Sequence, residues 1–218
     1  MLFPLRDENP NERFPFVTIT LILISVLVFL YELSLPDDAL VELVYAAGFL
    51  PSRLIGGPLP LGVELLPLAF TFVTHMFMHG GWMHLIGNMW FLWLFGDNIE
   101  DRLGHLRFLM LYIAWGWVAA AAQLVFGGDP SIPMVGASGA IAGVLGAYAI
   151  FYPTARIHSL LFIFILITRI TVPALLLLGL WFVYQFMSLG ETGVAWWAHI
   201  GGFVAGVLVA LPLKLSSR

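Results

Sequence analysis

Cysteine is absent from this sequence of 218 residues. Its absence excludes disulfide bonds, zinc–thiolate sites and cysteine nucleophiles. Charge is scarce as well, because only 10% of the residues are charged, whereas soluble domains carry about 25%. The composition therefore argues against a soluble globular protein.

Basic clusters and metal-binding motifs are also missing. The formal net charge is −4, and the 9 Lys and Arg residues are dispersed along the chain. Nucleic-acid binding requires a concentrated set of cations that face phosphates, so we expect no nucleic-acid partner. No H-E-x-x-H zinc motif occurs, and we expect neither a metal nor a cofactor.

Hydrophobic residues make up 61% of the chain and gather in long runs. A transmembrane helix requires about 20 mostly apolar residues. The sequence predicts an all-α membrane protein, a polytopic bundle of six transmembrane helices. The predicted spans are Phe16–Leu33, Trp82–Ile99, Arg107–Phe126, Val135–Tyr152, Thr171–Ser188 and Val194–Leu213.

The predicted domain organisation is one membrane domain with two short tails. We expect residues 1–15 to form a cytoplasmic tail, residues 16–213 to form the membrane domain, and residues 214–218 to form a second cytoplasmic tail. The first apolar run follows a polar segment of mixed charge, and no small-residue cleavage site comes after it. We therefore interpret it as a retained span rather than a signal peptide.

The positions of lysine and arginine predict how the spans are oriented. Cytoplasmic connections carry an excess of these residues. With six spans and a cytoplasmic N-terminus, only Arg53 among the 9 basic residues falls outside. The prediction is therefore N-in and C-in, and the short tails without a transit peptide favour a prokaryotic plasma membrane. The oligomeric state does not follow from the sequence.

Two connecting stretches do not fit simple spans. Residues 34–81 contain five prolines and a largely apolar part, and we expect short interfacial helices there. Ile157–Ile170 could begin an over-long fifth helix. We favour an interfacial segment on the cytoplasmic side, because Arg169 and Pro173 interrupt the apolar run.

Polar residues occur at the outer ends of three predicted spans. His84 and Asn88 are four residues apart on one helix face, and both can donate hydrogen bonds to a developing oxyanion. Ser138 begins the fourth span and His199 lies near the start of the sixth. A serine hydroxyl becomes nucleophilic when a base takes its proton. An imidazole, with an ordinary pKa of about 6.5, is a suitable base.

Glycines favour close contact between the two helices that carry Ser138 and His199. Gly136 precedes the serine, and Gly139 and Gly143 follow it at helical spacing. Gly202 and Gly206 are similarly spaced after His199. Small faces of this kind allow membrane helices to approach backbone to backbone, so we expect the imidazole to reach the hydroxyl.

The sequence offers no carboxylate to complete a catalytic triad. Asp97, Glu100 and Asp101 lie at the opposite end of the predicted second span. Glu191 lies in a short outer loop, eight residues before His199. The sequence therefore predicts a Ser-His dyad whose imidazole is oriented by packing.

Four motifs, in this order, resemble those of the rhomboid family of intramembrane serine proteases. They are His84-Leu85-Ile86-Gly87-Asn88, Glu100-Asp101-Arg102, Gly136-Ala137-Ser138-Gly139 and Ala198-His199-Ile200-Gly201-Gly202. Each motif alone is weak, but together they are specific. The resemblance extends over all six predicted spans.

The resemblance implies a set of roles. Ser138 would be the nucleophile and His199 the general base, with His84, Asn88 and the Ser138 amide forming the oxyanion hole. The substrates would be transmembrane proteins in a lipid bilayer, admitted past the fifth span and the loop before the sixth. Some relatives stack an aromatic residue on the catalytic histidine, whereas this chain has Ala142 there. We expect Trp196 or Trp197 to support the ring instead.

Alternative interpretations use the same residues. A serine in a membrane helix often bonds back to its own helix, and His84 with Asn88 could join helices rather than donate to a reaction. A catalytically inactive relative that binds transmembrane clients would usually lack the serine or the histidine. A metal-binding or transport protein could use His75, His79 and His84, although the spans lack the carboxylates expected of an ion pathway.

Overall fold

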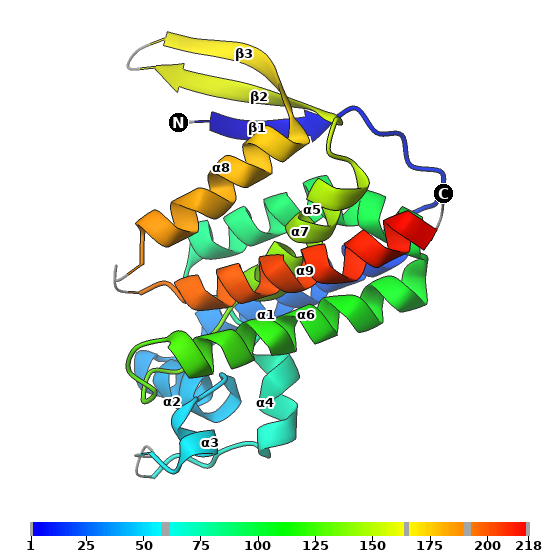
Figure 1. Cartoon of the computed structure of the whole chain (residues 1–218). Coiled ribbons are helices and arrows are strands. Elements are labelled where there is room, and N and C mark those ends of the chain that lie inside the picture. The colour runs from blue at the N-terminus through cyan, green and yellow to red at the C-terminus, as the bar shows by residue number, and fades with distance from the viewer. Residues whose placement is uncertain (1, 58–61, 164–165, 190–192, 217–218) are drawn as a thin grey trace.

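The computed structural model describes residues 2–57, 62–163, 166–189 and 193–216. These residues are mostly helical (Figure 1). The helices are α1 (Phe16–Ser34), α2 (Asp37–Ala47), α3 (Ser52–Ile55), α4 (Leu68–Thr74), α5 (Trp82–Leu103), α6 (His105–Phe126), α7 (Ser138–Phe151), α8 (Ala174–Met187) and α9 (Trp196–Ser216). The strands are β1 (Leu2–Asp7), β2 (Arg156–Ile163) and β3 (Leu166–Pro173).

Six of the helices coincide with the six predicted spans to within a few residues at each end. Of these, α1, α6 and α9 are long and apolar enough to cross a bilayer, and α7 and α8 are shorter apolar helices. These helices indicate an integral membrane protein. The count of six spans and the N-in/C-in orientation stay predictions.

Helix α7 forms the centre of the bundle. Its sequence consists largely of alanine, glycine and aliphatic residues, and every residue from Gly139 to Ala149 is buried. It packs against α5, α6 and α9. Because α7 begins at Ser138, this packing fixes the start of the helix that carries the candidate nucleophile.

Helices α7 and α9 touch backbone to backbone. A methyl group added at Gly206 would overlap the carbonyl oxygen of Gly143, and one added at Gly202 would overlap that of Gly139. Gly146 meets the carbonyl of Phe203 in the same way. Side chains larger than hydrogen would push the helices apart, so these glycines set the distance between them.

A buried carboxylate joins the end of α5 to the start of α1. Glu100 accepts hydrogen bonds from the backbone N–H groups of Val17 (2.8 Å) and Thr18 (2.7 Å) and from the Thr18 hydroxyl (2.7 Å). His105 Nδ1 lies 2.6 Å from the same carboxylate. The first turn of a helix leaves N–H groups unpaired and carries partial positive charge. Glu100 therefore caps α1 and anchors it to the bundle.

A three-stranded antiparallel sheet lies along one side of the bundle, beside α8 and α5, in the order β1-β2-β3 (Figure 1). The prediction of an all-α chain is therefore wrong in this respect. The segment Ile157–Ile170 is not part of the fifth helix, because most of it forms a hairpin of β2 and β3. Its place at the cytoplasmic interface stays a prediction. Residues 1–15, expected to be a tail, include β1, which pairs with β2. The pairing is long-range, so a local sequence window does not reveal it.

The long connection between α1 and α5 contains short helices, as predicted. Helices α2, α3 and α4 gather on the side of the molecule away from the sheet (Figure 1). Two backbone contacts tie this region to the loop before α7. Phe49 pairs with Met134, and the Gly136 N–H donates to the His75 carbonyl at 2.8 Å. The connection thus holds the loop that leads into Ser138.

Candidate active site

The Ser138 hydroxyl and the His199 imidazole lie in direct contact. Ser138 is the first residue of α7, and His199 lies in the first turn of α9. The distance from Ser138 Oγ to His199 Nε2 is 2.8 Å. The close approach of α7 and α9 at their glycines makes this distance possible.

The other nitrogen of the His199 ring contacts an amide on α8. His199 Nδ1 lies 2.8 Å from Gln185 Oε1, and Gln185 Nε2 donates to the Trp181 carbonyl at 2.9 Å. Because Gln185 Nε2 donates to the Trp181 carbonyl, it is Gln185 Oε1 that faces the His199 ring. Nδ1 then carries the proton and donates, which leaves Nε2 free to accept the Ser138 hydroxyl proton.

Two tryptophans border the His199 ring. The ring centroids of Trp181 and His199 are 6.0 Å apart with an interplanar angle of 35°, and those of Trp196 and His199 are 5.9 Å apart at 85°. Trp197, the alternative support, packs on Phe126 at 5.1 Å instead. The support for the ring therefore comes from α8 and the start of α9 rather than from the Ala142 position.

His84 and Asn88 converge on the loop that precedes Ser138. Gly136 has a φ of 124°, and a methyl group there would lie 2.7 Å from His84 Nε2 and 3.7 Å from Asn88 Nδ2. Gly136 thus precedes α7 and makes room for these side chains, rather than packing within a helix. The Gly80 N–H donates to His84 Nδ1 at 3.4 Å, which leaves the proton on Nε2. Among the described residues, none accepts a hydrogen bond from the buried Asn88 Nδ2.

His75 and His79 lie near His84 and the loop before α7, but neither forms a hydrogen bond with Ser138 or His199. His75 Nδ1 donates to the Thr71 carbonyl at 2.7 Å, and the His79 ring lies 5.1 Å from the His84 ring. Burial lowers the pKa of both His75 and His79 to about 4, so both are uncharged at neutral pH. In the described part of the chain, no group of three His, Asp or Glu side chains is arranged to hold a metal ion.

Gln185 and Trp181 are not among the site residues predicted from the sequence. Gln185 is 2% exposed and is the one amide in the otherwise apolar or aromatic sequence of α8, and a polar side chain in a membrane helix is a signal worth following. The carboxylates Glu100 and Asp101 lie at the other end of α5, where they bind the start of α1 and residues just before it. Glu191 lies outside the described residues.

The family model and the similar proteins point to the same family. The model of the Rhomboid domain matches residues 68–215. The chain is 35% identical over 143 residues to the rhomboid protease GluP of Bacillus subtilis (strain 168), which is 66% of this chain and 26% of that protein. It is 33% identical over 154 residues to rhomboid protein 1, mitochondrial, of Saccharomyces cerevisiae, covering 61% of this chain and 38% of that protein.

A third relative is rhomboid-like protease 5 of Toxoplasma gondii, 33% identical over 147 residues, or 64% of this chain and 16% of that protein. The chain thus matches well under half of the length of these relatives. The matched Rhomboid domain includes His84, Asn88, Ser138 and His199, and it covers more than half of the chain. By this match, the chain belongs to the rhomboid family.

Proposed function

We propose that this chain is a serine-type endopeptidase that cleaves transmembrane segments of membrane proteins through a Ser138–His199 dyad. The observation that supports this function most directly is the 2.8 Å contact between Ser138 Oγ and His199 Nε2. The names of relatives such as the rhomboid protease GluP agree with it. No cofactor is required, because a hydroxyl, an imidazole and hydrogen-bond donors suffice for acyl transfer.

In the first half of the reaction, Ser138 attacks the carbonyl carbon of the scissile peptide bond. His199 Nε2 accepts the hydroxyl proton as the Oγ–C bond forms. Gln185 accepts the hydrogen bond from Nδ1–H and so stabilises the imidazolium that results. His199 then gives its proton to the departing amine as the C–N bond breaks, which leaves an ester on Ser138.

The negative charge that develops on the carbonyl oxygen requires donors. Asn88 Nδ2 and His84 Nε2 both lie near Gly136, two residues before Ser138, and the Ser138 N–H is a first-turn amide of α7. Removing one such donor typically lowers the rate about 10²–10³-fold. In the second half of the reaction, water attacks the ester through the same groups. His199 accepts its proton, and the hydroxyl of Ser138 is restored.

The proposed topology has six spans with both termini in the cytoplasm, in a prokaryotic plasma membrane. Ser138 and His199 would then lie below the outer surface, at the N-terminal ends of α7 and α9. A backbone carbonyl in a helix is shielded from attack, so we expect substrates whose spans contain glycine or other helix-weakening residues. Entry past α8 and the loop before α9 follows from the family resemblance.

Labelling with a fluorophosphonate separates an active enzyme from an inactive relative. The reagent forms a bond only with an activated serine. We expect the reconstituted wild type to be labelled at Ser138 and both Ser138→Ala and His199→Ala to stay unlabelled. An unlabelled wild type, folded by the criterion of its thermal transition, would favour an inactive protein that binds transmembrane clients.

Gln185 is proposed as a positioning residue for the His199 ring. Replacing it with leucine removes the acceptor for Nδ1–H, and we expect kcat to fall about 10–100-fold, as for other groups that orient a histidine ring, with little change in KM. Gln185→Glu retains an acceptor, so it should restore most of the rate and shift the pH profile of kcat. The matched control is Gln123→Leu on α6, which should leave kcat unchanged. Equal losses in Gln185→Leu and Gln185→Glu would contradict this role.

A further inference from the structure

The sheet changes in character along its length. Its hairpin end is apolar, since β2 ends in Leu160, Leu161, Phe162 and Ile163 and pairs there with β3. The opposite end, where β2 leaves α7 and β3 enters α8, carries charged and polar side chains. These are Arg6 from β1, Glu8 directly after β1, Arg156 and His158 from β2, and Thr171 from β3. Arg169 of β3 lies where the polar and apolar parts meet, because it pairs with Leu160.

Two arginines from different strands line one cavity on this sheet. The cavity has a volume of about 400 Å³ and is lined by Leu5, Arg6, His158, Ser159 and Arg169. Arg6 pairs directly with His158 in the ladder, and Arg169 pairs with Leu160, two residues further along β2. Paired residues and those two apart lie on one face of a sheet. The arginines therefore flank the histidine on the same face.

The neighbouring acidic group is already engaged. Glu8 Oε1 lies 2.8 Å from His158 Nε2, and Thr171 Oγ1 lies 2.9 Å from His158 Nδ1. Within the part of the chain that the structure describes, no carboxylate forms an ion pair with Arg6, Arg156 or Arg169. The exposed arginines leave a local excess of positive charge that an anion can neutralise.

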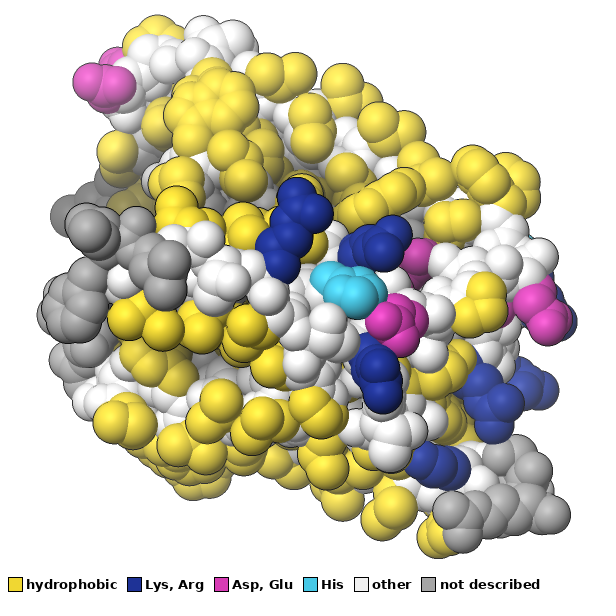
Figure 2. Space-filling view, turned by 90° about the horizontal axis from the view of Figure 1, so that it is seen from above, with side chains coloured by type: hydrophobic (Ala, Val, Ile, Leu, Met, Phe, Trp, Pro, Cys, Tyr) yellow, Lys and Arg dark blue, Asp and Glu magenta, His cyan; other side chains and the backbone are white. Residues whose placement is uncertain are grey.

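Exposed apolar side chains lie near both ends of the hairpin that contributes to this cavity. Ile163 and Ile167, near the hairpin end, are 46% and 59% exposed, and Leu175 and Leu176 of α8 are exposed directly after β3. Figure 2 shows this face from above, with Lys and Arg side chains gathered around a histidine and a carboxylate and bordered by hydrophobic side chains. A band of cations beside exposed apolar surface fits the boundary between lipid headgroups and acyl chains.

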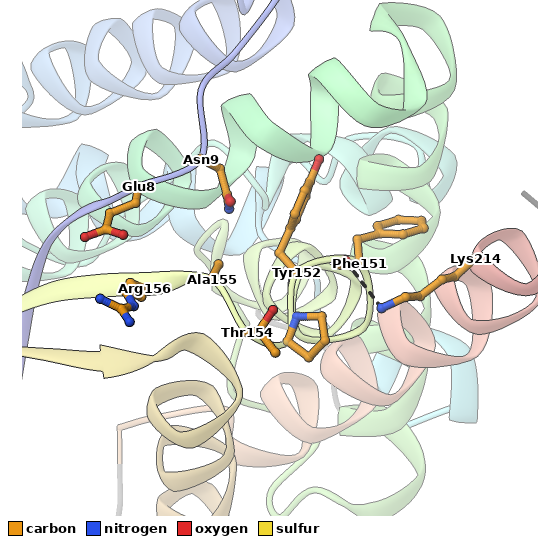
Figure 3. Close-up of a pocket in the computed structure, with 9 residues that line it drawn as sticks. Glu8, Asn9, Phe151, Tyr152, Thr154, Ala155, Arg156 and Lys214 are labelled. Carbon is orange, nitrogen blue, oxygen red and sulfur yellow. Dashed lines mark hydrogen bonds between the residues drawn. The ribbon is translucent and has the colours of Figure 1, made fainter. Parts of the chain in front are cut away.

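A second cavity near the sheet is less suited to an anion. It measures about 480 Å³ and lies at the end of α7, where Glu8, Asn9, Tyr152, Arg156 and Lys214 line it (Figure 3). Lys214 Nζ donates to the carbonyls of Ile150 and Phe151, so its ammonium group caps the C-terminal end of α7. Glu8 also contributes a carboxylate to this cavity.

We propose that the cavity between Arg6, His158 and Arg169 binds the phosphate of an anionic phospholipid in the leaflet beside the sheet. The two guanidinium groups would bind the phosphate oxygens, for which their planar donor geometry is suited. The apolar hairpin end and the exposed leucines of α8 would contact the acyl chains. The site is separate from Ser138 and His199, and it does not depend on the proposed protease activity.

Binding can be measured by native mass spectrometry of the full chain with phosphatidylglycerol, with phosphatidylcholine as the neutral comparison. We expect phosphatidylglycerol to be retained and phosphatidylcholine to be lost. An arginine that binds an anionic headgroup contributes about fivefold in affinity, and Arg6 and Arg169 line the cavity whereas Arg107 does not. Arg169→Gln should therefore weaken retention about fivefold and Arg6→Gln/Arg169→Gln about 25-fold. The matched control is Arg107→Gln, an exposed arginine at the start of α6, which should not change retention.

Several results would overturn the site. One is equal retention in Arg169→Gln, the double variant and wild type. Another is loss of retention in Arg107→Gln to the same extent. Competition by inorganic phosphate at millimolar concentration would also contradict it, because it would indicate a site for a free anion. A thermal transition measured for each variant distinguishes lost binding from lost folding, and a conservative Arg169→Lys variant should keep part of the affinity.

Discussion

Replacing Ser138 with alanine is expected to reduce cleavage of a single-span substrate by about 10⁴-fold or more. The substitution removes the nucleophile but no packing volume beyond one oxygen. His199→Ala removes the base and should reduce cleavage to a similar extent, because the hydroxyl then keeps its proton. Rates would be measured with wild type and variants in the same lipid vesicles.

The double variant Ser138→Ala/His199→Ala gives the sharper result. When two side chains act together in one step, removing either one abolishes nearly all of the rate enhancement that they supply. The double variant should therefore be no slower than the slower of the single variants. Ser131→Ala, which changes a partly exposed serine outside the site, is the matched control and should retain full activity. Cleavage by either single alanine variant at the rate of the wild type would show that these residues do not have the proposed roles.

Replacing Gly206 with alanine is expected to destabilise the protein by about 3 kcal/mol, the upper part of the range for overpacking. The new methyl group would overlap the Gly143 carbonyl oxygen in α7, and backbone atoms have little room to move in a tightly packed interface. The gain in helix propensity, about 1 kcal/mol, offsets only part of this effect. Gly206 lies about two turns from His199, so the variant tests helix packing rather than chemistry.

The free energy of unfolding would be measured in mixed micelles. Gly179→Ala is the matched control, because no atom outside its own helix lies near a methyl group added at that position of α8. It should be neutral or slightly stabilising. If Gly206→Ala were as stable as Gly179→Ala, the close contact between α7 and α9 would not be required for the fold.

The positions of the long helices could be predicted from the sequence because runs of about 20 apolar residues are a local signal. Helix α1 begins at Phe16 as predicted, and α8 starts directly after Pro173, the residue expected to interrupt the apolar run. The motifs around Ser138 and His199 also carried enough information to predict that these side chains would be near each other. Their roles in a reaction stay proposals.

The sheet and Gln185 could not be predicted in the same way. A run such as Leu160–Ile163 is apolar in a helix and in a strand alike, and its partner Leu2–Asp7 lies more than 150 residues away. Gln185 reaches His199 only because its face of α8 packs against α9. Which face packs there depends on the tertiary structure. Neither feature follows from spacing along one segment of the chain.

The unsatisfied amide nitrogen of Asn88 has a consequence for inhibitor design. A buried donor without an acceptor is unfavourable by about 1–3 kcal/mol, and among the described residues none accepts from Asn88 Nδ2. A covalent ligand on Ser138 that directs an anionic oxygen towards Gly136 would supply that acceptor. Such a compound, for example a boronate or phosphonate, should bind about 10-fold more tightly than an analogue of the same shape without the oxygen, and Asn88→Ala should abolish the difference.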